Sequence, residues 1–199
     1  MCGAGCDNGV VTSGASSFQR FSQADLGNAL AQCAGYVAAG PWGSPAVLFG
    51  LVPTSLLAEQ APDLVDAADD SALSPIVQES GDVDLEELLT SVSWPDAVVG
   101  CAIVTEITVL PPDAESALDD AFEPLLADPE AADAAARDAA HTHPERRDAR
   151  LIAGVLRTGQ RMALLSLRAR EGEDPAVEAD LRTHPTLAPN VLDALASTF

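Results

Sequence analysis

The amino-acid sequence predicts an α+β fold: a four-stranded, mostly antiparallel sheet flanked by helices, with an acidic, alanine-rich helical insertion before a final hairpin. Three observations predict it. Two apolar runs bounded by prolines, "PAVLFGLVP" and "PDAVVGCAIVTEITVLPP", have the length and the β-branched content of buried strands. Two further apolar runs flank a turn signal, Thr158-Gly159, as in a β-hairpin. Segments with helical spacing lie before, between and after these strands.

Length and composition are typical of a single globular domain. The chain has 199 residues, of which 47% are hydrophobic, and this is enough to bury a core. Residues 1–20 are rich in Gly, Ser and Ala without periodicity, so we expect a flexible tail there. We expect a single α+β domain over residues 21–199, with the acidic helical insertion at 113–145.

The first helix and the first strand have clear boundary signals. Ser22 and Asp25 match a capping box, and Gly40-Pro41 should end the helix. The predicted inward stripe of this helix is Leu26, Leu30, Cys33 and Val37. The following strand is apolar on both alternation phases, which predicts that it is covered on both sides, and it should end at Pro53.

Residues 54–81 are predicted to form a crossover. Thr54 can cap a short helix, whereas "LSPIVQESG" is interpreted as a loop. A second short helix is expected after Asp84, which forms a capping-box pattern with Glu87. Its expected apolar face is Leu85, Leu88, Leu89 and Val92. The strand near 96–112 should be central, and a helical crossover leaves a parallel pair possible between it and the first strand.

The final hairpin can be assigned a register. A two-residue turn at Thr158-Gly159 would pair Leu156 with Arg161, so that paired residue numbers sum to 317. One face of the hairpin would then carry Leu151, Ala153, Val155, Met162 and Leu164, and the other Ile152, Gly154, Leu156, Ala163, Leu165 and Leu167. A last helix, "APNVLDALASTF", should pack inward through Leu187, Val191, Leu192 and Leu195.

This register also separates the arginines of the hairpin. Arg157 and Arg168 would lie at the ends of one face, and Arg150 and Arg161 at the ends of the other. We therefore interpret them as strand-end and turn residues whose stems cover apolar edges, and not as one patch.

The charge distribution excludes several partner classes. The net charge is −21, and residues 1–136 hold 22 acidic residues against a single base, Arg20. Such a field repels phosphate backbones, so we expect neither nucleic acid nor an anionic membrane as a partner. The longest uninterrupted apolar run, "AVVGCAIV", is far shorter than a membrane span, and the N-terminus has no signal-peptide pattern. We expect a cytoplasmic protein.

Candidate metal ligands and nucleophiles are few. His141 and His143 have the spacing of a ligand pair, but the sequence around them supplies few further ligands beside several arginines. Cys2 and Cys6 lie in the glycine-rich tail, and Cys101 is expected to be a small buried residue. Phosphate-loop, nucleophile-elbow and zinc-helix motifs are missing from the sequence. We therefore assign no catalytic, metal-binding or cofactor-binding residue, and we expect no cofactor.

Four stretches carry a resemblance to a known family: "GYVAAGPWGSPAVLFGLVPT", "SWPDAVVGCAIVTEITVLPP", "HTHPERRDARLIAGVLRTGQRMALLSLRA" and "LAPNVLDALA". They resemble a family of small acidic proteins of unassigned function from high-GC Gram-positive, actinobacterial species. The resemblance extends from about Tyr36 to the C-terminus, and the first 20 residues depart from it. It implies that the hairpin belongs to the core fold, and it implies no activity, cofactor or catalytic residue.

The leading functional hypothesis is a non-enzymatic protein that acts by association, either with itself or with another protein. The hairpin is apolar on both faces and the chain has few helices, so an uncovered apolar sheet face could be an interface. The alternative is a small hydrolase or transferase. Its site would use Glu106, which interrupts an apolar strand, together with Asp96 and the loop from His141 to Arg150. A metal-dependent regulator that uses His141 and His143 ranks third.

Overall fold

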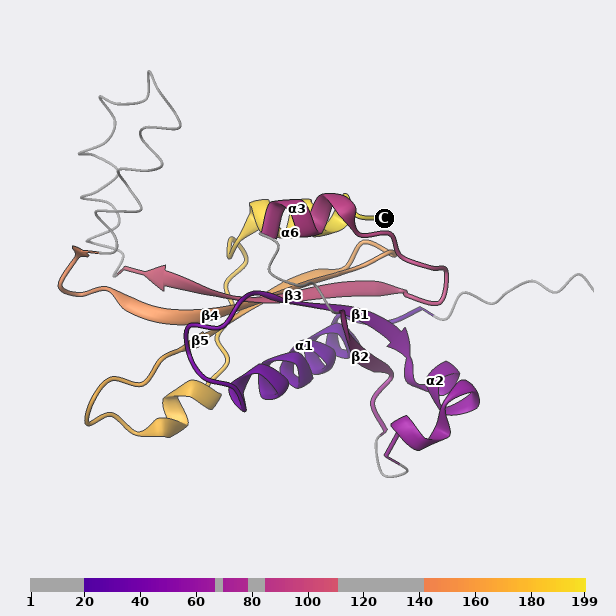
Figure 1. The fold of residues 1–199 in the computed structure, drawn as a ribbon, viewed down its shortest axis with the longest axis horizontal. Helices are drawn as coiled ribbons and strands as arrows, with labels where there is room; N and C mark the ends of the chain where they lie inside the picture. Colours follow the sequence, from indigo (N-terminus) through magenta and orange to yellow (C-terminus); the bar gives the residue numbers. More distant parts are fainter. Residues whose placement is uncertain (1–19, 67–69, 79–84, 111–141) are drawn as a thin grey trace, which may run out of the picture.

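The computed structural model describes residues 20–66, 70–78, 85–110 and 142–199. These residues form an antiparallel sheet with the strand order β2-β1-β3-β4-β5, so the sheet has five strands where the sequence predicts four. Helix α1 lies on one face, and α3 and α6 lie on the other (Figure 1). The α+β fold class is therefore confirmed. The predicted tail up to residue 19 and the predicted insertion up to residue 141 lie outside the described residues.

The central strand is the one that the sequence predicts. Strand β3 (Gly100–Val109) lies between β1 (Val47–Pro53) and β4 (Arg147–Leu156). The parallel pair that the sequence left possible between β1 and β3 does not form, because these two strands are antiparallel. The strand parallel to β3 is β2 (Leu73–Gln78), which lies on the other side of β1, so the crossover through α3 starts from β2 and not from β1.

Strand β2 is the element that the sequence analysis misses, since it treats this segment as a loop. After β1 the chain forms α2 (Thr54–Gln60) and the short helix η1 (Pro62–Leu64), and it then returns along β1 as β2. Thr54 begins α2 rather than capping it. The sequence analysis took Pro75 as a sign of a loop, but in the structure Pro75 is paired with Leu51 of β1. The carbonyl of Leu51 accepts the N–H of Val99 on the side of β1 that faces away from β2. The ring nitrogen of Pro75 therefore lies on the outer edge of β2, where a strand tolerates proline.

The hairpin of β4 and β5 (Arg161–Leu167) has a register one residue away from the prediction. Paired residue numbers sum to 316, as in Ala153 with Ala163 and Val155 with Arg161. The loop holds three residues: Leu156 donates to the carbonyl of Gln160, and Gly159 has a φ of +97°. This is a type I turn followed by a left-handed glycine. The one-residue slip moves every β5 side chain to the opposite face from the predicted one.

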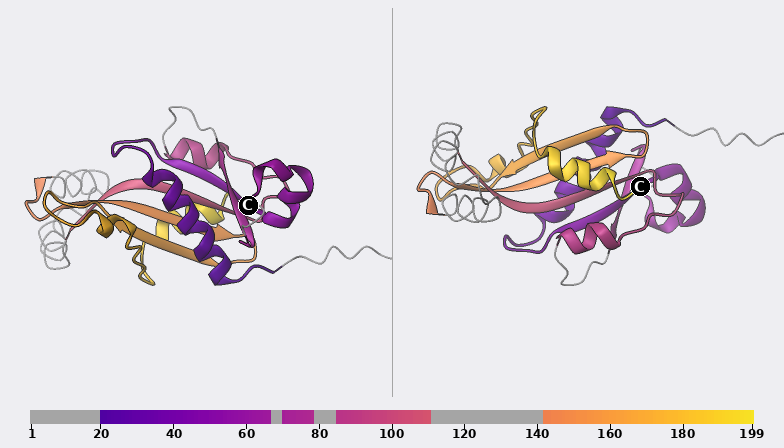
Figure 2. Two further views of the ribbon diagram at one scale, coloured as in Figure 1. Left: turned by 90° about the horizontal axis from the view of Figure 1, so that it is seen from below. Right: turned by 90° about the horizontal axis from the view of Figure 1, so that it is seen from above.

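Helix α1 (Gln23–Ala38) covers one face of the sheet. Ser22 and Asp25 form the predicted capping box at its start. The core of this layer consists of hydrophobic side chains from α1, from Phe21 just before it and from every strand: Phe21, Leu26, Ala29, Leu30, Cys33, Phe49, Leu51, Leu73, Ala102, Val104, Ile152, Leu156 and Leu164. The helix crosses the strands obliquely (Figure 2).

Helices α3 (Leu85–Ser91) and α6 (Pro189–Ala196) cover the other face (Figure 2). The core of this layer is Leu48, Trp94, Val98, Cys101, Ile103, Leu151, Ala153, Val155, Ala163 and Leu195. The expectation that too few helices leave a bare apolar sheet face is wrong, because each face carries its own packed helical layer. In the described part of the chain, no helix is long and apolar enough to cross a membrane.

Each layer buries one cysteine, which makes thiol reactivity a probe of the fold. Burial raises the pKa of Cys33 to about 12 and that of Cys101 to about 11, from an ordinary value of 9.0. In a Cys2→Ser/Cys6→Ser variant we expect Ellman's reagent to modify neither thiol at pH 8 until the protein unfolds. Since the unfolded thiols ionise first, stability should fall as the pH rises above about 9. Rapid modification of the native variant would contradict this packing.

Candidate functional site

Glu106 is held by an arginine and does not point freely into water. It faces Arg150 across the β3–β4 ladder, and Oε1 of Glu106 lies 3.6 Å from Nε of Arg150. The other carboxylate oxygen accepts the backbone N–H of Gly43 at 2.8 Å. Arg150 is only 3% exposed, and its Nη2 donates to the carbonyls of Gly40 and Pro41, both at 3.2 Å. The pair thus fastens the segment between α1 and β1 to the sheet.

Together with the pair of Glu106 and Arg150, Trp42 forms a clamp on the segment between α1 and β1. Its ring lies 4.2 Å from the guanidinium carbon of Arg150 and 5.1 Å from that of Arg168. The predicted register places these two arginines on different faces of the hairpin, and the structure brings them to the same indole. Because Glu106 and Arg150 are engaged with each other and with backbone groups, their arrangement is that of a structural ion pair.

Of the other residues of the enzyme hypothesis, Arg150 contacts Glu106, whereas Asp96 lies apart from it. Asp96 is exposed in the turn before β3, and six residues of β3, a length of about 20 Å, separate that end from Glu106. Nδ1 of His143 accepts the N–H of Glu145 at 3.1 Å, within its own turn. Asp96 and Glu106 therefore do not share a site.

Metal-ligating groups do not gather in the described residues. In that part of the chain, no three His, Cys, Asp or Glu side chains could hold one ion together. His141, Cys2 and Cys6 lie outside the described residues. Sγ of Cys101 lies 3.8 Å from the Leu195 carbonyl and from the Thr198 hydroxyl, so it is enclosed beneath α6.

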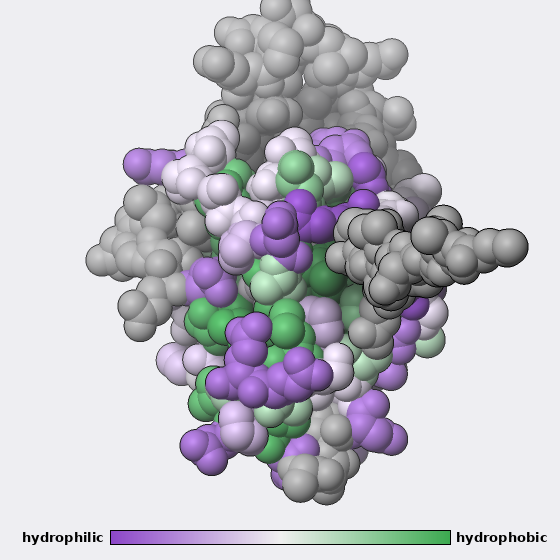
Figure 3. Space-filling model, turned by 90° about the vertical axis from the view of Figure 1, so that its right-hand side faces the viewer, coloured by the Kyte–Doolittle hydropathy of each residue, from purple (hydrophilic) through white to green (hydrophobic). Residues whose placement is uncertain are grey.

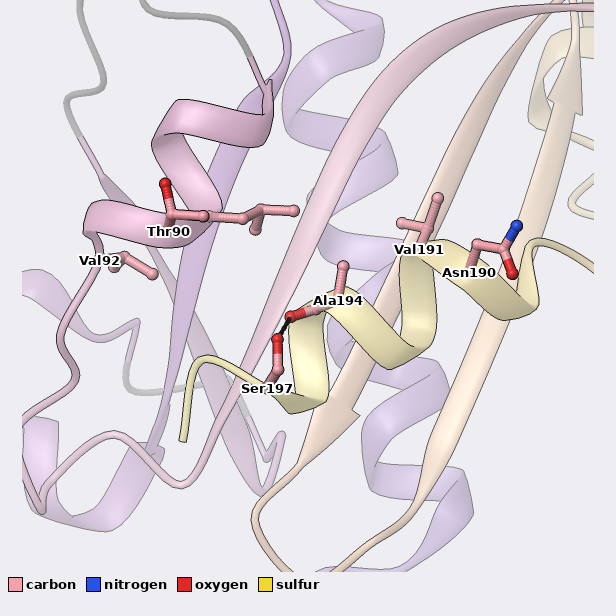
Figure 4. Close-up of a pocket in the computed structure, with 7 residues that line it drawn as sticks. Thr90, Val92, Asn190, Val191, Ala194 and Ser197 are labelled. Atoms are coloured by element: carbon pink, nitrogen blue, oxygen red, sulfur yellow. Dashed lines mark hydrogen bonds between the residues drawn. The ribbon is translucent and has the colours of Figure 1, made fainter. Parts of the chain in front are cut away.

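A groove lies between α3 and α6 (Figure 4). It has a volume of about 600 Å³. Four apolar side chains and three small polar ones line it: Leu89, Val92, Val191 and Ala194, with Thr90, Asn190 and Ser197. We call it the α3–α6 groove. Its volume is within the range of ligand and peptide sites.

Helix α6 is anchored on the sheet, and the two walls of the α3–α6 groove are joined at one end. Leu195 fixes α6 on the sheet and is fully buried. Nε1 of Trp94, just after α3, donates to the Thr198 hydroxyl at 2.9 Å, and the Trp94 and Phe199 rings lie 6.2 Å apart. These contacts join the helices at one end, and the groove remains open between them (Figure 4).

Both edges of the sheet are protected from pairing with another strand. On β5, Leu165 exchanges two backbone hydrogen bonds with Arg182, of 2.7 and 2.9 Å. The Thr183 hydroxyl donates to the Ala163 carbonyl at 2.8 Å. On β2, Pro75 removes one donor from the outer edge. Strand addition at an edge is therefore disfavoured, and this leaves the helical layers as surfaces for association.

The end of the molecule that carries α2 has no continuous apolar face among the residues drawn in colour. Hydrophobic residues there form separate areas between hydrophilic ones (Figure 3). Leu64 in η1 is 71% exposed. Single exposed hydrophobic residues are normal on a protein surface.

Four arginines gather at the open end of the hairpin, and only Arg168 among them belongs to the set that the sequence interpretation separated. The start of β4 and the segment after β5 together line a second hollow with Arg146, Arg147, Arg168 and Arg170. The sequence analysis did not consider this cluster, although its own register pairs Arg147 with Arg170. The available signal was the pairing of "ERRD" with "LRAR" at the open end of the hairpin.

Comparison with protein families gives one match. The model of the family described as PPA1309-like protein matches residues 26–199. The search of curated proteins and the search of solved structures each found no match.

Proposed function

The chain belongs to the PPA1309-like protein family, and from that premise we propose that it is a non-enzymatic cytoplasmic protein that binds a basic, amphipathic helical segment of another protein. The observation that carries the proposal is the α3–α6 groove. A third helix can lie in a groove between two others and insert apolar side chains at i, i+3 or i+4, and i+7.

The lining of the groove suits the apolar side chains of a partner helix. Leu89, Val92, Val191 and Ala194 present apolar surface that is only partly buried in the free chain. Thr90 and Ser197 donate to the carbonyls of Glu87 and Ala194 in their own helices, so they need no polar partner from a ligand. The groove therefore favours apolar side chains over a polar small molecule.

Charge complementarity selects the partner. The chain carries a net charge of −21, and each helix beside the groove has an exposed acid, Glu87 on α3 and Asp193, which pairs with Arg161, on α6. A second copy of the chain would bring the same charge, so self-association in this groove meets repulsion. A partner helix with Lys and Arg around its apolar stripe is attracted to the same surface.

A peptide titration tests the proposal. The probe is a fluorescent 18-residue helical peptide of Leu and Lys, and the comparison is the same peptide with Glu in place of Lys. At physiological salt we expect the Lys peptide to bind with a Kd in the micromolar range, and the Glu peptide not to bind. Ala194→Gln, which fills the groove without changing charge, should weaken binding at least tenfold.

The matched control is Leu64→Gln, which changes an exposed apolar residue that does not line the groove. It should leave the Kd unchanged. Equal affinities of the two variants would show that the peptide binds the acidic surface at large, and this would overturn the proposal. Sedimentation velocity provides a second criterion, since a dimer that Ala194→Gln dissociates would identify the occupant as another copy of this chain.

A further inference from the structure

The hollow lined by Arg146, Arg147, Arg168 and Arg170 has the features of a second binding site, independent of the α3–α6 groove. It has a volume of about 320 Å³, and Pro144, Asp148 and Ala169 complete its lining. We call it the arginine pocket. We propose that it binds a small molecule through a doubly charged oxyanion, such as a phosphate group.

The sheet holds the two sides of the arginine pocket together. The backbone N–H of Arg168 donates to the Asp148 carbonyl at 2.9 Å, and Nε of Arg147 donates to the Arg168 carbonyl at 3.0 Å. Nη2 of Arg170 reaches the carbonyls of Glu145 and Arg146, at 3.3 and 3.4 Å. The turn before β4 and the segment after β5 are thus fastened to each other, so Arg147, Arg168 and Arg170 are positioned before a ligand arrives.

The pocket has more positive than negative charge. Arg147 pairs with Glu173, and Arg168 pairs with Asp148 at 3.0 Å. Arg170 donates to carbonyl groups, which do not neutralise it. Arg146 is exposed, and within the described part of the chain its side chain has no hydrogen bond or ion pair. Among the described residues, two guanidinium groups therefore remain without a carboxylate partner.

The chemistry of these groups selects the ligand. A guanidinium presents two parallel N–H donors that match two oxygens of a phosphate. The remaining two positive charges correspond to a phosphate monoester, which carries a charge of about −2 at neutral pH. The acidic remainder of the chain is screened beyond about 8 Å at physiological salt, so the local charge dominates for a small anion. A long polyanion would extend over the acidic surface, and this disfavours nucleic acid.

Isothermal titration with sodium pyrophosphate and with inorganic phosphate tests the inference. We expect saturable binding of both, tighter for pyrophosphate, while sodium chloride at equal ionic strength gives no saturable signal. Arg146→Gln should weaken pyrophosphate binding at least fivefold. This variant breaks no hydrogen bond or ion pair of the described structure, so its fold should be unchanged by circular dichroism.

The matched control is Arg161→Gln, which removes the same charge from an exposed arginine that pairs with Asp193 beside α6. It should bind pyrophosphate like the unchanged protein. Equal losses in the two variants would mean that only net charge matters, and the inference would fail. Tighter binding of a single-stranded oligonucleotide than of pyrophosphate would overturn the small-molecule class. Neither outcome affects the α3–α6 groove, because the two sites share no residue.

Discussion

Replacing Arg150 by alanine is expected to lower the free energy of unfolding by about 3–5 kcal/mol. The residue is 3% exposed, and its side chain is the ionic partner of Glu106. Its removal leaves that carboxylate three-quarters buried with the N–H of Gly43 as its remaining contact. It also removes the donor to the carbonyls of Gly40 and Pro41. Urea unfolding, followed by circular dichroism, measures the loss.

The control for this prediction is Arg161→Ala. Arg161 also pairs with a carboxylate, that of Asp193, but the two side chains are 44% and 69% exposed. Exposed ion pairs contribute about 0–1 kcal/mol, so the control should be nearly as stable as the unchanged protein. If Arg150→Ala lowers the free energy of unfolding no more than Arg161→Ala does, the clamp at Trp42 does not stabilise the fold.

Leu30→Ala is expected to cost about 2–5 kcal/mol, because it opens a cavity in the layer between α1 and the sheet. Leu30 is fully buried, and its Cδ2 atom is only 2.6 Å from the position that a Cβ at Gly154 would occupy. Gly154→Ala alone should therefore destabilise by about 1–3 kcal/mol through overpacking. In the Leu30→Ala background the added methyl enters vacated space, so Gly154→Ala should cost much less.

A double-mutant cycle by urea unfolding measures this coupling. The comparison cycle combines Gly154→Ala with Leu195→Ala, which lies in the other layer. The two effects in that cycle should add, since the residues share no layer. Additive effects in the cycle of Leu30 and Gly154 as well would contradict the close packing of α1 on β4.

Local signals in the sequence were sufficient for the elements that local interactions determine. The side chains of Ser22 and Asp25 define the start of α1 within one turn, and the structure has the capping box there. The long β-branched run around Cys101 predicts a buried central strand, because its apolar residues occupy both alternation phases. Neither inference depends on how distant segments meet.

The errors arise where one position decides between two local structures. Gly159 fits a two-residue turn as well as a three-residue loop with a left-handed glycine. The structure has the three-residue loop. Pro75 argues against a strand unless its nitrogen faces outward, and that depends on the pairing with Leu51. The α3–α6 groove could not be predicted, since the helices that line it are far apart in the sequence.

The two tryptophans of the chain occupy places that make them separate optical reporters. The ring of Trp42 contacts Arg168, which lines the arginine pocket. Trp94 bonds Thr198, the neighbour of Ser197 in the wall of the α3–α6 groove. Intrinsic emission from a variant that keeps only one indole therefore follows occupancy of one site without interference from the other, and no external dye is needed.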